Sequence, residues 1–342
     1  MSVFTGIVFH GIGGGAAASF YLPFKKVKDW AWESYWLVSG VAAWIIMPLL
    51  MGFLFIPDLF EVIFSSPTDT LFWTFFFGLL WGIGGLTFGL SMRYLGISLG
   101  YAVVLGFTAA FGTLIPPLFD GTIFILLESS SGWFLLGGIL LCLTGIVFCG
   151  LAGKAKEKEL SPQMKKTSIS EFDLKKGLLI ALTSGVLSAC MAFALAAGKP
   201  IAEQAVKFGA PVLWQNNAVL VVILWGGFLT NFTWCLYLNL KNSSHRDYFD
   251  GKAKALFPNY MFSSLAGAIW YLQFFFYGMG STQMGQFDFI SWTLHMTFII
   301  ILSTLWGIYL KEWKGTSTKT KRQLGIGLMF LILSIMVIGL GG

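Results

Sequence analysis

The positively charged residues of this chain are concentrated in alternate gaps between its apolar runs. Twenty of the 22 Lys and Arg residues fall in every second gap, and the alternate gaps contain only Lys199 and Lys207. Because Lys and Arg collect in the cytoplasmic loops of membrane proteins, this alternation predicts a polytopic membrane protein with its basic gaps in the cytoplasm. The basic gaps are Lys25–Lys28, Arg93, Lys154–Lys176, Lys241–Lys254 and Lys311–Arg322.

The apolar runs have the length and composition of membrane helices. The chain is 56% hydrophobic and 11% charged, with a mean hydropathy of +0.76, whereas a soluble domain carries about 25% charge. A helix crosses the hydrocarbon in about 20 apolar residues, and these runs lack the strict alternation of barrel strands. We therefore predict an all-α membrane protein with ten transmembrane helices. The runs cover residues 3–24, 34–56, 71–92, 95–118, 133–152, 177–197, 212–240, 259–279, 288–310 and 323–341.

The chain ends and the remaining charge fit this topology. Positive charge follows the first apolar run, whereas a signal peptide begins with it, so we expect that run to stay as a helix with residue 1 outside. Ten crossings then place residue 342 outside too. The net charge of +6 lies in loops that flank the membrane, which indicates contact with anionic lipids and no nucleic-acid partner. The four cysteines lie inside runs, and we interpret them as packing residues.

The longest polar stretch divides the chain into two halves. Residues 153–176 form a predicted cytoplasmic linker between five runs in 1–152 and five in 177–342. Because five is odd, the halves must cross the membrane in opposite senses, as in transporters built from inverted repeats. Matching residues give modest support. Trp81, Gly89 and Gly96 have the spacing of Trp270, Gly278 and Gly285, and Gly6 and Gly14 have that of Gly177 and Gly185.

A few ionisable residues at membrane depth are candidates for proton coupling. Asp288, Trp292 and His295 are spaced i, i+4 and i+7, so they share one face of the ninth helix. His10 enters the first helix from the same side, at a similar expected depth. Histidine titrates near neutral pH and suits proton transfer, although a neutral, hydrogen-bonded histidine is an equal alternative. Glu33 is either a solvated interfacial charge or an inner proton gate.

Aromatic residues and amides are candidates for binding a sugar. Trp270, Gln273, Phe274 and Tyr277 share one face of the eighth helix. Aromatic rings stack on the C–H faces of a sugar while an amide bonds its hydroxyls; packing between helices is the alternative. Asn217 lies at the outer end of the seventh run, in either a cavity or a loop. Nothing indicates a metal, a cofactor or a covalent nucleophile, so a proton is the only predicted coupling ion.

Several long blocks resemble the L-rhamnose–proton symporter family of the drug/metabolite transporter superfamily. The resemblance runs nearly end to end and is carried by Phe20–Glu33, Trp81–Gly96, Phe172–Leu178, Trp270–Gly280 and Phe287–Phe298. It implies a ten-helix inverted repeat that imports L-rhamnose with a proton across a bacterial inner membrane. The matching segments contain Glu33, Trp81, Gln273, Asp288, Trp292 and His295, and His10 also fits.

The chain also departs from that family's pattern. Gly85 and Thr87 stand where the family has polar asparagines, and Gln215–Asn217 differs from better-known members. Both departures are expected to retune the sugar pocket, which adds Thr87 and Asn217 to its predicted residues.

The prediction is thus proton-coupled import of L-rhamnose, or of a close 6-deoxy sugar, by alternating access. The sugar is expected between the third, eighth and ninth helices. One alternative is a transporter or exchanger of another small metabolite. A membrane-embedded enzyme is disfavoured, because the sequence lacks clearly paired titratable groups at the membrane boundary or a metal set. The exact sugar, the proton stoichiometry and the oligomeric state stay open.

Overall fold

The computed structural model describes residues 2–95, 97–119, 121–159, 174–249, 253–311 and 313–341. Within these ranges the chain forms helices and their connections, with no β-strand. The long helices are α1 (Val3–Ser19), α5 (Thr68–Leu95), α6 (Ile97–Phe119), α8 (Ser130–Glu159), α10 (Leu174–Ala197), α12 (Asn216–Lys241), α13 (Ala253–Gln283), α14 (Ser291–Tyr309) and α15 (Thr318–Gly341). The short ones are η1 (Pro23–Lys26), α2 (Trp32–Val41), η2 (Ala42–Ile46), α3 (Met47–Phe55), α4 (Leu59–Phe64), α7 (Thr122–Leu127), α11 (Lys199–Lys207), η3 (Val212–Trp214), η4 (Ser244–Tyr248) and η5 (Gly285–Ile290).

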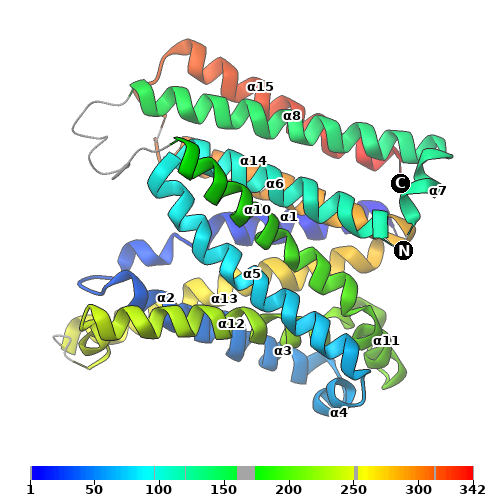
Figure 1. Cartoon of the computed structure of the whole chain (residues 1–342), viewed down its shortest axis with the longest axis horizontal. Helices are drawn as coiled ribbons and strands as arrows, with labels where there is room; N and C mark the ends of the chain where they lie inside the picture. The colour runs from blue at the N-terminus through cyan, green and yellow to red at the C-terminus, as the bar shows by residue number, and fades with distance from the viewer. Residues whose placement is uncertain are drawn as a thin grey trace.

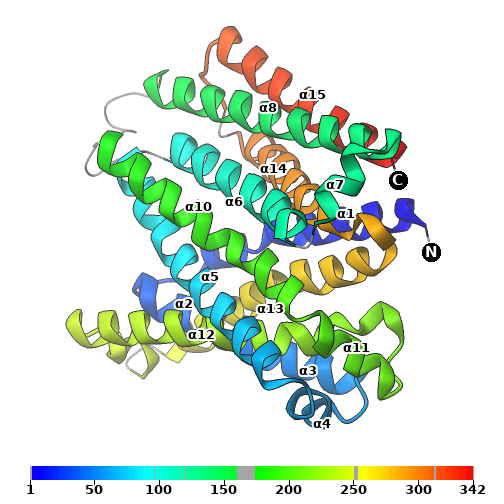
Figure 2. The same cartoon turned by 45° about the vertical axis from the view of Figure 1, so that its right-hand side comes forward.

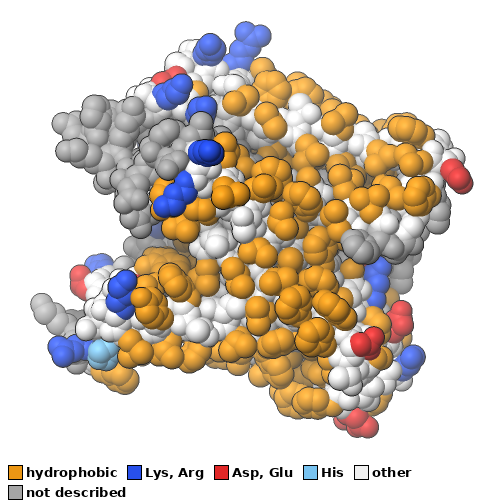
Figure 3. Space-filling view, in the orientation of Figure 1, with side chains coloured by type: hydrophobic (Ala, Val, Ile, Leu, Met, Phe, Trp, Pro, Cys, Tyr) orange, Lys and Arg blue, Asp and Glu red, His pale blue; other side chains and the backbone are white. Residues whose placement is uncertain are grey.

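The protein is an all-helical, multi-pass membrane protein. Within the described ranges, eight segments are long and apolar enough to cross a membrane: Val3–Lys26, Trp32–Phe55, Thr68–Phe88, Gly132–Lys156, Lys175–Lys207, Val212–Lys241, Ser291–Tyr309 and Thr318–Leu340. Each coincides with one of the predicted runs. The two remaining runs fall in α6 and α13. Figure 3 shows a broad apolar band between the charged ends of the molecule, as expected of a surface that faces lipid.

The second spanning segment is one continuous helix with a widened turn. α2, η2 and α3 follow each other without a break from Trp32 to Phe55, and η2 is a π-helical turn. It ends two residues before Pro48, whose missing N–H removes one α-helical hydrogen bond. Such turns often mark functional positions, and this one contains Trp44, a buried residue of the aromatic cluster described below.

Helices of the two halves pack in a pattern that repeats when the halves are exchanged. The contact of α5 with α10 has its equivalent in the contact of α13 with α1. In the same way, the α5–α12 contact corresponds to α13–α2, and the α6–α10 contact corresponds to α14–α1. α8 and α15 pack along each other as a pair at one edge of the molecule (Figures 1 and 2).

Glycines make the closest of these approaches at matching positions. A Cβ at Gly185 of α10 would overlap the Cβ of Phe107 of α6, and a Cβ at Gly14 of α1 would overlap the Cβ of Phe298 of α14. Gly14 and Gly185 are one of the pairs that the sequence comparison of the halves proposed. Because lipid provides no hydrophobic force between helices, small residues that admit a neighbouring helix supply much of the packing energy.

The two ends of the bundle differ in charge. Figure 3 shows Lys and Arg gathered at the left end and Asp and Glu more frequent at the right. α1 begins and α15 ends at that right end (Figures 1 and 2), where α4, α7 and α11 also lie. α8 continues as a helix through Glu159 and α10 begins at Leu174, so both extend into the predicted linker 153–176. The rest of that linker lies outside the described residues.

Candidate functional site

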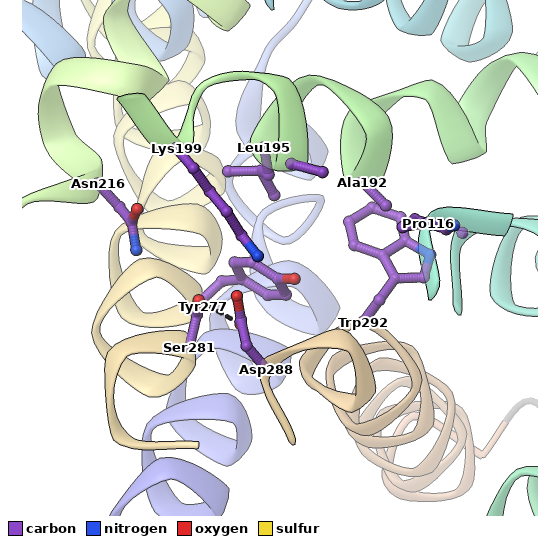
Figure 4. A pocket seen from close by; sticks show the side chains of 11 residues that line it. Pro116, Ala192, Leu195, Lys199, Asn216, Tyr277, Ser281, Asp288 and Trp292 are labelled. Carbon is purple, nitrogen blue, oxygen red and sulfur yellow. Dashed lines mark hydrogen bonds between the residues drawn. The ribbon is translucent and has the colours of Figure 1, made fainter. Parts of the chain in front are cut away.

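A pocket opens where η5 meets the ends of α10 and α6. η5 connects α13 to α14, outside the spanning helices, and both halves of the chain contribute to the pocket wall. Figure 4 shows polar groups from α11, α12, α13 and η5 on one side and the Trp292 ring on the other. The lining residues are Gly112, Pro116, Ala192, Leu195, Ala196, Lys199, Asn216, Tyr277, Ser281, Asp288 and Trp292.

Asp288 is the acidic group of this pocket. Its Oδ1 accepts a hydrogen bond from the Ser281 hydroxyl at 2.5 Å and a longer one from Ser291 at 3.3 Å. Burial raises the pKa of Asp288, while Ser281, the charge of Lys199 and Ser291 each oppose that rise. A carboxyl group whose pKa is raised exchanges its proton closer to neutral pH.

Lys199 brings a positive charge to the same pocket. It is the first residue of α11, where Pro200 is well accommodated because a proline at the start of a helix loses no helical bond. In Figure 4 its side chain extends across the pocket towards Asp288 and the ring of Tyr277. The two hydrogen bonds to Asp288 come from the serines, and Lys199 acts on it through charge.

Behind Tyr277 lie two histidines that are fully buried. The ring centroids of His10 and His295 are 6.3 Å apart, and those of Tyr277 lie 5.2 Å from His10 and 5.3 Å from His295. None of the four imidazole nitrogens makes a hydrogen bond of acceptable geometry with the described residues, although the backbone of His10 lies near the His295 ring. Gly280 admits the His10 ring, since a Cβ there would lie 2.8 Å from it.

Trp292 ties α14 to α6. Its Nε1 donates to the Thr108 carbonyl at 3.0 Å, and the indole packs against Gly112, where no Cβ would fit. At the next residue of each helix, the hydroxyls of Thr113 and Thr293 are 2.6 Å apart. These buried bonds fix the indole as a wall of the pocket.

Three tryptophans from three helices form a separate cluster. Trp44 lies 6.1 Å from Trp81 and 5.5 Å from Trp270 between ring centroids, and Trp81 and Trp270 are 5.6 Å apart. Gln273 donates to the Trp270 carbonyl one turn earlier in its own helix. Phe274 links this cluster to the histidines, because its ring centroid is 6.0 Å from that of His295. Trp81, Trp270 and Gln273 therefore do not line the pocket of Asp288.

Two predicted sugar ligands have other partners. Thr87 donates to the Ile83 and Gly84 carbonyls of its own helix. Asn217 donates to the Trp214 carbonyl and accepts from the Tyr271 hydroxyl, while its neighbour Asn216 is the residue that lines the pocket.

Glu33 lies in a polar network at the far end of the bundle. It is 5% exposed, and its Oε1 accepts from Asn242 and Ser244 at 2.9 and 2.6 Å. Asp247 accepts from the Ser34 hydroxyl and the Ala31 amide. The network joins the start of α2 to the end of α12 and to η4, so Glu33 is not the solvated charge that one interpretation expected.

Sequence reasoning missed Lys199, Ser281 and Trp44, and it included Asn216 only as part of the Gln215–Asn217 stretch. Lys199 left a signal as one of the two Lys residues in alternate gaps that otherwise contain no Lys or Arg. Ser281 is an unremarkable polar residue near a helix end until neighbouring helices bring it to the pocket. In the part of the chain that the structure describes, no group of three or more His, Cys, Asp or Glu side chains could hold a metal ion.

Comparisons with known proteins are consistent along the whole chain. The family model of the L-rhamnose-proton symport protein (RhaT) matches residues 1–342. Proteins named L-rhamnose-proton symporter from Yersinia pestis (strain Pestoides F) and Yersinia pseudotuberculosis serotype O:1b (strain IP 31758) are each 39% identical over 343 residues, which cover 99% of this chain and 98% of the relative. A protein of the same name from Yersinia pestis bv. Antiqua (strain Antiqua) is 38% identical over the same length.

Proposed function

This chain belongs to the L-rhamnose-proton symport protein family, and from that premise we propose that it imports L-rhamnose together with a proton by alternating access. It is a transporter and not an enzyme. The observation that carries this proposal is a pocket between the halves in which Asp288 faces Tyr277 and Trp292. A close 6-deoxy sugar or another small metabolite is the runner-up, because Gly85 and Thr87 depart from the family's pattern.

We infer ten membrane helices in two inverted repeats. α6 and α13 join the eight apolar segments, and residues 1–152 and 177–342 are the repeats, with 153–176 between them. Two observations support this division. Equivalent helices of the two halves make equivalent contacts, and Gly14 and Gly185 each admit a phenylalanine of a neighbouring helix at matching positions. By the positive-inside rule the basic end lies in the cytoplasm of a bacterial inner membrane, in contact with its lipids, and both termini lie outside.

In this arrangement the pocket faces outwards and takes up sugar and proton together. The rings of Trp292 and Tyr277 would stack on the sugar, while Asn216 and Ser281 offer hydrogen bonds to its hydroxyls. Asp288 would receive the proton, since burial raises its pKa. His295 and His10 would receive the proton deeper in the bundle, because a ring nitrogen that accepts no hydrogen bond has a free lone pair for it and histidine is the side chain that exchanges protons near neutral pH.

The opposite end is closed in this state. The hydrogen bonds of Glu33 and Ser34 with Asn242, Ser244 and Asp247 would keep the cytoplasmic ends of the halves together. When they open, a path would lead inwards along the tryptophan cluster. Trp81, Trp270 and Gln273 would contact the sugar on that path, with Thr87 and Asn217 shaping its walls. Glu33 would then receive the proton at the inner exit.

Uptake of labelled L-rhamnose into proteoliposomes tests the proposal. One charge moving through about 100 mV gains roughly 2.3 kcal/mol, which supports about 50-fold accumulation at tenfold per 1.36 kcal/mol. We expect accumulation only with an inward proton gradient, and competition by 6-deoxy sugars more than by other hexoses. Counterflow without any gradient-driven accumulation would exclude proton coupling, and an absence of both would exclude L-rhamnose as the substrate.

A further inference from the structure

Lys199 is the one charged residue of the pocket that the transport scheme does not use. Both cations of the alternate gaps lie on the nine-residue helix α11, Lys199 at its start and Lys207 at its end. Only Lys199 lines the pocket. Eight residues of helix separate the two by about 12 Å along the axis. Both side chains are exposed, so α11 holds a cation at the pocket mouth and a matched one away from it.

The charges that face Lys199 are few. Asp288 of η5 and Tyr277 of α13 share the pocket with it. The described lining residues from α10, α12, α6 and α14 carry no titratable group. On α11 itself Glu203 follows at i+4, but both side chains are exposed, and such exposed pairs contribute only about 0.3–0.5 kcal/mol. Asp288 is therefore the partner that can compete for the ammonium group within the pocket.

The geometry points to Lys199 as the coupling switch, which rests on the proposed symport function. We propose that the Lys199 ammonium pairs with ionised Asp288 and closes the empty pocket, and that protonation of Asp288 releases Lys199 to donate hydrogen bonds to a sugar hydroxyl. The four-carbon stem of lysine is flexible and its ammonium has three donors, so one side chain can serve both partners in turn.

This exchange explains why sugar should not enter without a proton. A sugar hydroxyl is neutral and cannot displace an ammonium group from a partly buried carboxylate, because a charged partner binds it more strongly than a neutral one. Once the carboxyl is protonated, the ammonium loses that partner. The sugar then replaces it, and the pocket carries sugar and proton together.

Substrate protection in the unmodified protein gives the first test. Proteoliposomes are acetylated with a lysine-reactive reagent, with and without L-rhamnose, and the labelling of Lys199 relative to Lys207 is measured by mass spectrometry at several pH values. The ratio cancels the common effect of pH on amine reactivity. We expect L-rhamnose to reduce the ratio at least threefold, and the empty protein to show a lower ratio above the pH at which Asp288 ionises than below it. A ratio that responds to neither sugar nor pH would overturn the switch.

Substitution gives the second test. Lys199→Met should raise the KM for counterflow about tenfold, as expected for the loss of a hydrogen bond to a charged group, and should abolish the dependence of counterflow on pH. Lys207→Met is the matched control and should behave like the unchanged protein. If the unchanged protein transports L-rhamnose with protons while Lys199→Met keeps its pH profile, only the switch fails. If the unchanged protein transports no L-rhamnose, the proposed function fails instead.

Discussion

Single polar residues stand out in a chain this apolar because each is costly to bury. A buried donor or acceptor without a partner costs about 1–3 kcal/mol, and His10 and His295 together leave four ring nitrogens in that state among the described residues. Both histidines lie where α1 packs against α14, and their role in the transport cycle is the proposal made above.

Replacing His295 tests that role. We expect His295→Ala to lose gradient-driven accumulation of L-rhamnose, because the buried proton position disappears, while the protein still inserts and folds. His245→Ala is the control, since His245 is exposed in η4 at the other end of the bundle. Accumulation by His295→Ala equal to that of the control would remove His295 from the coupling mechanism.

Ser281 should set the pH at which the pocket loads. Its hydrogen bond stabilises the ionised form of Asp288 and lowers the pKa that burial raises. Ser281→Ala removes that bond, so the pKa of Asp288 should rise further and the pH of half-maximal uptake should move in the alkaline direction. Ser303→Ala is the control, because Ser303 bonds only carbonyls of its own helix among the described residues. An acidic shift or an unchanged pH profile would contradict this account of Asp288.

At the scale of helices, contact depends on small residues at defined positions. Two neighbouring glycines of α5 differ in whether a helix–helix contact requires them. A Cβ at Gly84 would lie 2.5 Å from the backbone nitrogen of Ser188 in α10, whereas a Cβ at Gly85 would meet nothing within 4 Å. The first glycine is required by the close approach of two helices, and the second is not.

The two glycines therefore predict opposite outcomes. Gly84→Ala should lower the stability of the folded protein by about 1–3 kcal/mol, as overpacked cores do, and should lower its melting temperature in detergent. Gly85→Ala should be neutral or stabilise by up to about 1 kcal/mol, because alanine has the higher helix propensity. Equal melting temperatures for the two variants would show that α5 and α10 are not packed this closely.

At the scale of the whole molecule, the two ends differ in their polar groups. One end has a pocket with a carboxyl group, a lysine and aromatic walls, and at the other end hydrogen bonds around Glu33 and Asp247 join the start of α2 to the end of α12 and to η4. A single fixed shape of this kind binds at one face only. Transport requires the opposite arrangement as well, and a pair of inverted repeats can supply it because exchanging their conformations exchanges the open and closed ends.

The orientation of this arrangement can be tested directly. In a chain whose Cys142, Cys149, Cys190 and Cys235 have been replaced, Ser2→Cys should react with an impermeant maleimide in intact spheroplasts. Thr318→Cys, at the start of α15, should react only after permeabilisation, because we place the basic end in the cytoplasm. The reverse labelling pattern would invert the topology and place the pocket on the inner face.

The sequence by itself determined the all-helical membrane class and eight of the ten predicted runs, and it predicts the side of each loop. Run length, hydropathy and the placement of Lys and Arg are local properties, so they located the eight apolar segments found among the described residues, but they assigned no role to Lys199. They predicted Asp288, Trp292 and His295 on one helical face, but Asp288 lies in η5, and α14 with Trp292 and His295 begins only at Ser291. Tertiary structure decided which of these residues meet. It placed Tyr277 and Trp292 with Asp288, and Trp81, Trp270 and Gln273 in another cluster.

The physical reason is that contacts between membrane helices depend on rotation and closeness. Both are set by small residues and buried hydrogen bonds from distant parts of the chain, such as the approach of α1 to α14 at Gly14 and the bond from Trp292 to the Thr108 carbonyl. Periodicity tells which residues share a face, but the neighbour that this face meets is a property of the assembled bundle. Asn216 and Ser281 became pocket residues only through that assembly.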